Sequence, residues 1–342
     1  MTTPPEEVLL DVSHLSTAFP LHGREVAAVD DVSFVVHRGE TLGLVGESGS
    51  GKSVTALSIV QLVAPPGRIA AGRVVFEGQD LLSLNDRAMQ RVRGRRIGFI
   101  FQEPMVALDP VYTIGAQIEE TLRTHGLATG AAARRRALEL LDAVSIPDPA
   151  RRHGEYPHQL SGGLRQRAMI ALALTAEPSL IIADEPTTAL DVTVQAEILE
   201  LLRDMRRAFS LAVLLITHDL GVVASMAHRV AVMYSGNIVE EGPVTRVLRE
   251  PAHPYTRALL ASIPGAHPGT RLQAIGGMVP PLDRRPSGCR FAPRCPSRFE
   301  PCEAMPDARI AGPNHYARCF LHQSEAAPSL APHPDTQGRP GA

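Results

Sequence analysis

Long apolar runs are missing from this sequence. The longest uninterrupted ones, such as residues 211–216, are far shorter than the roughly 20 residues that a helix needs to cross a bilayer. Residues 1–7 are polar and contain proline, so the apolar core of a signal peptide is missing as well. We therefore expect the chain to stay in the cytoplasm, and another subunit must cross any membrane that it serves.

An excess of charge of either sign is also missing. The 34 basic and 36 acidic residues nearly cancel and leave a net charge of −2. A chain with this balance has no overall field that would attract nucleic acid or an acidic membrane surface. Four arginines gather within residues 91–96, and we interpret this short run as a solvated face. The composition therefore gives no support for a nucleic-acid partner.

Cysteine is missing from the first 288 residues and then occurs four times within 31 residues. Proline is skewed in the same direction, because 16 of its 29 copies lie in the last 92 residues. This change of composition predicts a boundary after Pro251. We expect a first domain over residues 1–251, a C-terminal extension over residues 252–323 and a disordered tail over residues 324–342. The four cysteines are Cys289, Cys295, Cys302 and Cys319.

Residues 46–53, here called the phosphate loop, are the stretch around which the chain is organised. They fit the pattern G-x-x-x-x-G-K-[ST], with an apolar strand predicted before them at 41–45 and an apolar helix after them at 54–62. Glycines let backbone N–H groups turn toward an anion, and the start of the helix adds partial positive charge. Lys52 is expected to reach the β- and γ-phosphates and Ser53 to bind Mg²⁺. A glycine-rich turn with a chance lysine is the alternative. The predicted nucleotide ligands are Gly46, Ser48, Gly49, Ser50, Gly51, Lys52 and Ser53.

Three further apolar segments are predicted to be buried strands, at residues 97–101, 180–183 and 211–217. Ligands collect at the carboxyl ends of parallel strands. The second of these strands delivers two adjacent carboxylates, Asp184 and Glu185, to that edge. We expect Asp184 to be a partner of Mg²⁺, and Glu185 to orient and deprotonate an attacking water.

Polar side chains follow the other two strands. Gln102 has an amide oxygen suited to Mg²⁺ or to a bound water, with an ordinary loop residue as the alternative. His218 is placed to hydrogen-bond a γ-phosphate, with a structural histidine as the alternative. Near the N-terminus, Phe19 is suited to stack on an adenine ring or, equally, to pack in the core.

A second glycine pair lies within residues 103–177, a segment of mainly helical pattern. Ser161, Gly162 and Gly163 precede an apolar helix, so a hydroxyl, backbone N–H groups and the helix dipole would face one negative charge. In isolation, an N-capped helix without a ligand explains the same residues. Asp191 is suited to cap the next helix, whose apolar residues recur at three- and four-residue spacing.

Taken together and in this order, the motifs resemble those of the ATP-binding subunit of an ABC transporter, over about the first 250 residues. The resemblance implies an α/β fold of the P-loop ABC ATPase class, with a mainly parallel core sheet, an antiparallel β subdomain and a helical subdomain. It also implies that two such domains, identical or paralogous, pair head to tail, so that Ser161 and Gly163 of one complete the ATP site of the other. The motifs are the phosphate loop, Gln102, residues 160–163, Asp184, Glu185, Asp191 and His218.

Three features are similar to the oligopeptide and dipeptide importers, a subgroup that also includes importers of nickel. Leu164 stands where the commonest signature has glutamine, and residues 101–105 and 253–260 match the subgroup's pattern. The resemblance implies two transmembrane permease subunits as partners and an extracytoplasmic solute-binding protein that acts through them. It places the chain on the cytoplasmic face of the cell membrane.

The cysteines follow the spacing C-x5-C-x6-C-x16-C between prolines. Four thiolates in stiff loops are a competent ligand set for an iron–sulfur cluster or for zinc, although the paired C-x2-C of zinc ribbons is missing. The resemblance to peptide-importer subunits favours a [4Fe–4S] cluster first and structural Zn²⁺ second. Disulfides are the remaining alternative, which a reducing cytoplasm disfavours.

The resulting hypothesis is ATP hydrolysis that drives solute import. MgATP binds through Lys52, Ser53 and Gln102, Glu185 activates water, and Lys52 with His218 stabilises charge on the γ-phosphate. The main rival is a soluble ABC-type ATPase that acts on DNA or ribosomes. It is disfavoured by the single phosphate loop and by the missing heptad insertion and basic stripe. A third hypothesis makes the cysteine region an iron sensor or redox module that the ATPase carries.

Overall fold

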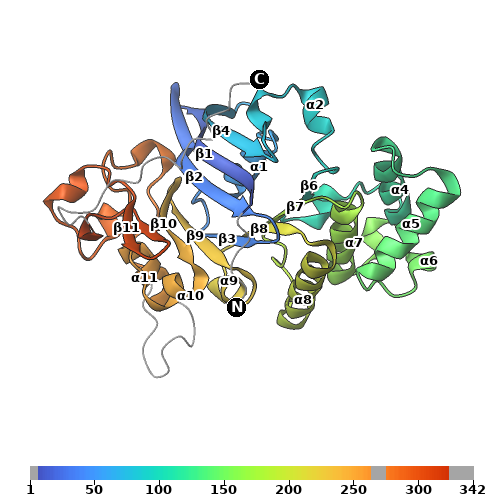
Figure 1. The fold of residues 1–342 in the computed structure, drawn as a ribbon. Coiled ribbons are helices and arrows are strands. Elements are labelled where there is room, and N and C mark those ends of the chain that lie inside the picture. The colour runs from blue at the N-terminus through green and yellow to red at the C-terminus, as the bar shows by residue number, and fades with distance from the viewer. Residues whose placement is uncertain (1–6, 263–274, 323–342) are drawn as a thin grey trace, which may run out of the picture.

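The computed structural model describes residues 7–262 and 275–322, and in these residues two sheets carry the fold (Figure 1). The larger sheet has five parallel strands, because β9, β3, β8, β7 and β6 pair in parallel register, and an antiparallel edge beyond β9. Its central strands are mainly apolar and buried at every residue, as expected for strands that are covered on both faces. In spatial order its strands are β11 (Arg309–Gly312), β12 (His315–Ala317), β10 (Asn237–Pro243), β9 (Arg229–Tyr234), β3 (Thr41–Val45), β8 (Ala212–Thr217), β7 (Leu180–Asp184) and β6 (Ile97–Ile100).

The smaller sheet is antiparallel, as the resemblance implies, and two of its strands precede the phosphate loop in the chain while two follow it. Its order is β2 (Arg24–His37), β1 (Val8–Leu21), β4 (Arg68–Phe76) and β5 (Gln79–Asp80). The pairing of β1 with β2 contains several register shifts, and both strands continue through them. His22 and Gly23, both with positive φ, form the turn between them.

Helices separate into those that flank the main sheet and those that form a region of their own. In Figure 1 the helical region around α4, α5 and α7 lies on one side of the main sheet, and the C-terminal extension lies on the opposite side. The α-helices are α1 (Lys52–Ile59), α2 (Asp86–Gln90), α3 (Pro104–Ala107), α4 (Ile114–Thr124), α5 (Gly130–Ala143), α6 (Pro149–Arg152), α7 (Gly162–Leu174), α8 (Val192–Phe209), α9 (Leu220–Met226), α10 (Val244–Arg249) and α11 (Pro254–Ala261). Short 3-10 helices occur at Leu81–Ser83, Pro157–Gln159, Leu282–Arg284, Ala292–Arg294, Glu300–Glu303 and Phe320–His322. None of the described helices is long and apolar enough to cross a membrane.

Helix α1 is shorter than the apolar pattern predicts. It ends at Ile59, and Gln61 adopts a positive φ of 52°. The Gln61 amide donates to the carbonyl of Leu81, and Arg93 donates to the carbonyl of Val60 at 2.7 Å. The arginine run therefore has a structural task at this position, since one of its members satisfies a carbonyl that the helix end leaves open.

The C-terminal extension is joined to the main sheet through β12, which pairs with β10. Glu240 on β10 is fully buried, and it accepts hydrogen bonds from the backbone N–H groups of Ala252 and His253, each at 2.8 Å. Apolar side chains of β9 and β10 share one core cluster with Phe291 and two of the cysteines. The boundary after Pro251 stays a prediction, and the predicted tail at 324–342 lies outside the described residues.

Candidate functional site

The phosphate loop connects β3 to α1 at the edge where the parallel strands end. Gly46 runs close to the backbone of β9: a Cβ at this position would lie 2.1 Å from the carbonyl oxygen of Met233. Gly51 has a φ of 106°, and a Cβ there would meet the carbonyl oxygen of Ala28 at 2.9 Å. These two glycines are therefore required by the path of the chain, and they leave the first N–H groups of α1 without a side-chain cap.

Lys52 is folded back over the loop. Its Nζ donates to the carbonyl oxygens of Gly46 at 2.8 Å and Glu47 at 3.0 Å. The residue is 5% exposed. Burial lowers the pKa of the Lys52 ammonium, while the nearby carboxylates of Glu185 and Asp184 act in the opposite direction. A triphosphate would supply the missing negative charge, so this arrangement suits an anion between the loop and the acidic pair.

Ser53 and Asp184 lie together, as the sequence predicts. The Ser53 hydroxyl donates to Asp184 Oδ1 at 3.1 Å. Burial raises the pKa of the Asp184 carboxyl, and the hydrogen bond from Ser53 only partly offsets this. A hydroxyl and a carboxylate are hard oxygen ligands, and Mg²⁺ in nucleotide sites takes its remaining ligands from phosphates and water. The residues present therefore fit Mg²⁺ bound together with a nucleotide.

The Glu185 side chain is held by contacts at the same sheet edge, where the parallel strands end. Its backbone φ is 47°, an uncommon value for a non-glycine residue. Thr188 donates to Glu185 Oε2 at 2.7 Å, and His218 Nδ1 lies 3.2 Å from Oε1. Burial raises the pKa of the Glu185 carboxyl, but the contacts with Thr188 and His218 outweigh it, so the net pKa is lower than usual. The carboxylate is therefore ionised at neutral pH and able to accept a proton.

The remaining predicted residues occupy separate parts of the site. Gln102 is exposed in the loop that follows β6, at the same sheet edge as the acidic pair. Phe19 is half-buried and its ring packs over Gly67, where an added Cβ would lie 2.4 Å from the ring. That contact accounts for part of the ring, and stacking on adenine stays a prediction.

The second glycine pair packs against the segment that follows the acidic pair. The Ser161 hydroxyl accepts the N–H of Leu164 at 3.4 Å and so caps α7. A Cβ on Gly163 would lie 2.8 Å from the Val194 side chain. Asp191 caps α8, because its Oδ1 accepts the N–H of Val194 at 3.0 Å. The capping roles are confirmed, whereas a ligand at Ser161, Gly162 and Gly163 stays a prediction.

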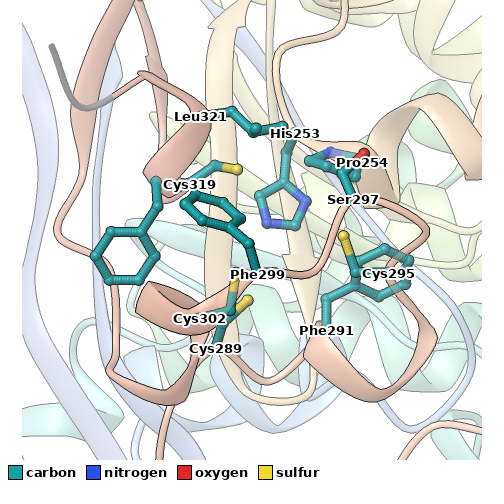
Figure 2. A pocket seen from close by; sticks show the side chains of 11 residues that line it. His253, Pro254, Cys289, Phe291, Cys295, Ser297, Phe299, Cys302, Cys319 and Leu321 are labelled. Atoms are coloured by element: carbon teal, nitrogen blue, oxygen red, sulfur yellow. The ribbon is translucent and has the colours of Figure 1, made fainter.

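The four cysteines surround one small pocket in the C-terminal extension, shown in Figure 2. All four are free thiols. The pocket has a volume of about 10 Å³ and is also lined by His253 and by apolar side chains such as Phe291. Burial, with nearby thiols adding to it, raises the pKa of Cys289 to about 11. Among the described residues, no three His, Cys, Asp or Glu side chains are grouped so as to hold a metal ion. The expected four-thiolate metal site is therefore not supported by these side-chain positions.

Sequence reasoning missed three residues that belong to this region: Glu47, Tyr255 and Arg294. Glu47 occupies a position that the phosphate-loop pattern leaves unspecified. Its N–H donates to Tyr255 Oη, and its carboxylate pairs with Arg294. The partners lie in the C-terminal extension, 208 and 247 residues further along the chain. No local signal could have indicated these contacts.

The fold and the edge site together define an ATP-binding cassette. The ABC transporter family matches residues 29–188, and the family of the oligopeptide/dipeptide transporter C-terminal region matches residues 239–302. A putative peptide import ATP-binding protein of Brucella melitensis is 51% identical over 93% of this chain and 98% of its own length. Another from the same species is 54% identical over 84% of this chain and 87% of its own length. The chain therefore belongs to the ABC transporter family of ATP-binding proteins and is an ABC-type ATPase.

Solved structures agree with this assignment. The ATP-binding cassette MJ0796, in a dimeric post-hydrolysis state with ADP and Pi, superposes with a TM-score of 0.63 at 29% identity. The superposition covers 69% of this chain and 99% of the MJ0796 chain. Another dimeric structure of that cassette gives a TM-score of 0.62 at the same identity. The expected ABC ATPase fold is confirmed.

Proposed function

We propose that this chain is the ATP-hydrolysing subunit of a transporter that imports di- or oligopeptides, or related small solutes, across the cytoplasmic membrane. The observation that carries the proposal is the convergence of the Ser53–Asp184 and Glu185–His218 pairs beside Lys52 at one sheet edge. The peptide class is supported by the matched C-terminal region and by the names of the relatives, which are putative peptide import ATP-binding proteins.

Each residue at this edge has a task that its chemistry supports. Backbone N–H groups of the phosphate loop and the Lys52 ammonium bind the phosphates, and Phe19 stacks on the base. Ser53, Asp184 and Gln102 would hold Mg²⁺, which neutralises charge on the phosphates when it is bound. Glu185 takes a proton from the attacking water, while Lys52 and His218 stabilise charge that develops on the γ-phosphate.

A second ABC ATPase subunit, identical or paralogous, completes the site. The two MJ0796 cassette structures that resemble this chain are dimeric. In our proposal Ser161, Gly162 and Gly163 bind the nucleotide held by the partner's phosphate loop, and Asp191 lies at the same junction. Ser161 and Gly162 are exposed, which leaves them accessible to such a partner.

Two permease subunits dock, in our proposal, beside the loop that follows Gln102. A groove of about 280 Å³ is lined there by residues that include Asp109, Tyr112 and Gln117. Large apolar side chains stand exposed next to it, with Val106 79% and Val111 70% exposed. Apolar groups so open to water indicate an interaction surface. The permeases place the chain on the cytoplasmic face of the membrane, and an extracytoplasmic solute-binding protein delivers the solute to them.

A [4Fe–4S] cluster at the four cysteines, with Zn²⁺ as the alternative, is a separate proposal. It rests on the spacing of the cysteines and on the resemblance to peptide-importer subunits, because all four thiols line one pocket but no three of them, among the described residues, are grouped so as to hold a metal ion. The volume of about 10 Å³ is room for little more than one water molecule. A cluster would therefore require the pocket to widen, and no step of hydrolysis depends on it. Iron, sulfide and zinc analysis of anaerobically purified protein tests it, and metal-free protein that keeps its fold and ATPase activity rejects it.

Isolation of the chain from membranes tests the proposed function. Co-purification with two hydrophobic permeases, together with peptide uptake that stops in an Lys52→Ala variant, is the expected result. Recovery with DNA or ribosomes and without permeases would instead support a soluble ABC-type ATPase.

A further inference from the structure

Glu47, the second residue of the phosphate loop, is held by the C-terminal extension at two points. Tyr255 Oη accepts the backbone N–H of Glu47 at 2.9 Å. Arg294 donates to both carboxylate oxygens, from Nη1 at 2.7 Å and from Nη2 at 3.1 Å. The extension therefore fixes both the main chain and the side chain of one phosphate-loop residue.

Arg294 is itself held rigidly. Its side chain is 4% exposed, and the guanidinium lies 5.8 Å from the ring centroid of Tyr234. The Nε atom donates to the carbonyl of Gly276 at 2.8 Å, and Nη2 donates to that of Ile275 at 3.3 Å. A two-pronged pair of arginine with carboxylate is strong and directional, and here the arginine side chain is almost fully covered while the Glu47 side chain is 27% exposed.

Tyr255 is fixed by packing on all sides. Its side chain is fully buried, and its ring centroid lies 4.6 Å from that of Tyr234 and 5.4 Å from that of Phe291. Aromatic contacts at these distances are favourable and define the orientation of the ring. The packing of the ring therefore fixes the hydroxyl oxygen in the position where it accepts the N–H of Glu47.

Glu47 passes these constraints on to the nucleotide site, because its carbonyl oxygen accepts a hydrogen bond from Lys52 Nζ at 3.0 Å. The charge of the Glu47 carboxylate also acts on Lys52, so an unneutralised carboxylate here would repel a triphosphate bound at the loop. Arg294 supplies the opposite charge from outside the site. We propose that Arg294 and Tyr255 are positioning residues for nucleotide binding, which hold Glu47 so that the phosphate loop and Lys52 are ready for MgATP.

This inference rests on the proposed function, namely that the phosphate loop binds MgATP. Calorimetric titration of the full-length chain with MgATP tests both, with four proteins compared: wild type, Arg294→Met, Glu47→Gln and the double variant. Arg294→Met should weaken binding on the order of tenfold, because it leaves the Glu47 carboxylate unpaired. Adding Glu47→Gln to Arg294→Met should restore most of the lost MgATP affinity, because no unpaired charge remains beside the phosphates.

Restored binding would show that Arg294 acts by neutralising the Glu47 carboxylate, since a general loss of structure would not be restored by Glu47→Gln. A double variant that binds no more tightly than Arg294→Met overturns the proposal, and so does an Arg294→Met variant with wild-type affinity. Tyr255→Phe keeps the buried ring and removes only the acceptor, and should weaken binding by about threefold to tenfold. Arg294→Lys should bind more tightly than Arg294→Met if the charge is what matters.

Arg318→Met is the matched control. Like Arg294, Arg318 lies next to a cysteine of the extension and pairs with an acidic residue of the first domain, Asp31, at 2.9 Å. Its guanidinium donates to the carbonyl oxygen and the carboxylate of Asp31 and not to the phosphate loop, so MgATP affinity should stay at the wild-type value. Wild-type protein that binds no MgATP, or an Lys52→Ala variant that binds as tightly as wild type, counts against the proposed function. If Lys52→Ala loses MgATP affinity while Arg294→Met binds MgATP as tightly as wild type, only the positioning role is overturned.

Discussion

His315 Nε2 lies 2.7 Å from the buried carboxylate of Glu240. This contact joins β12 of the C-terminal extension to β10, the strand with which it pairs. Burial raises the pKa of the Glu240 carboxyl. The hydrogen bonds from His315 and from the N–H of Ala252 outweigh burial, so the net pKa is lower than the usual 4.5. The ionised carboxylate is therefore part of what holds the C-terminal extension in place.

Acid should loosen the extension before the rest of the chain unfolds. A carboxyl group with a lowered folded-state pKa contributes stability that is present above its unfolded-state pKa and is lost as the pH falls through the folded-state value. We expect protease cleavage within the extension to increase below about pH 4.5. Glu240→Gln should cost about 1–3 kcal/mol at pH 7 and make the loss in acid shallower. An unchanged acid profile in that variant would show that Glu240 does not contribute.

Lys52 is the only lysine in the sequence, so amine chemistry reports on the phosphate loop directly. An acetylating reagent should modify Lys52 and the N-terminal amine and no other amine. Because the ammonium is covered by bound nucleotide, MgATP at a hundred times its dissociation constant should slow the modification of Lys52 by up to about a hundredfold. Peptide mass spectrometry measures this, and the N-terminal amine is the internal control. Equal rates with and without bound MgATP would show that Lys52 is not at the nucleotide.

The ionised Asp184 carboxylate should lower the stability of the nucleotide-free chain and should be essential for Mg²⁺-dependent activity. Burial raises the pKa of its carboxyl, so at pH 7 the ionised group contributes unfavourably to folding, and this cost disappears when the carboxyl is protonated. Asp184→Asn should therefore raise the unfolding midpoint of the nucleotide-free chain by about 2–4 °C while Mg²⁺-dependent ATPase activity is lost. Ser53→Ala should lower the midpoint instead, since it removes the hydrogen bond that stabilises the carboxylate. A lower midpoint for Asp184→Asn would contradict this explanation.

The nucleotide edge could be predicted from the sequence because its residues follow apolar strands immediately. Asp184 and His218 come directly at strand ends, and parallel register brings such ends together. The contact of Arg294 with Glu47 could not be predicted, because it depends on how a loop-rich extension folds against the phosphate loop, 247 residues earlier in the chain. The cysteines illustrate a different limit: their spacing predicts one shared metal site, and the structure places all four around one pocket, but among the described residues no three thiols are grouped closely enough to hold a metal ion.

The assembled transporter with Glu185→Gln tests the central claim, that this carboxylate activates the water that attacks ATP. A general base typically contributes 10²–10⁴-fold to a rate. The amide keeps the size of the side chain and its contact with Thr188, so MgATP binding should remain near the wild-type value. We predict turnover reduced by about 10²–10⁴-fold with MgATP still bound, and turnover equal to wild type would contradict the account.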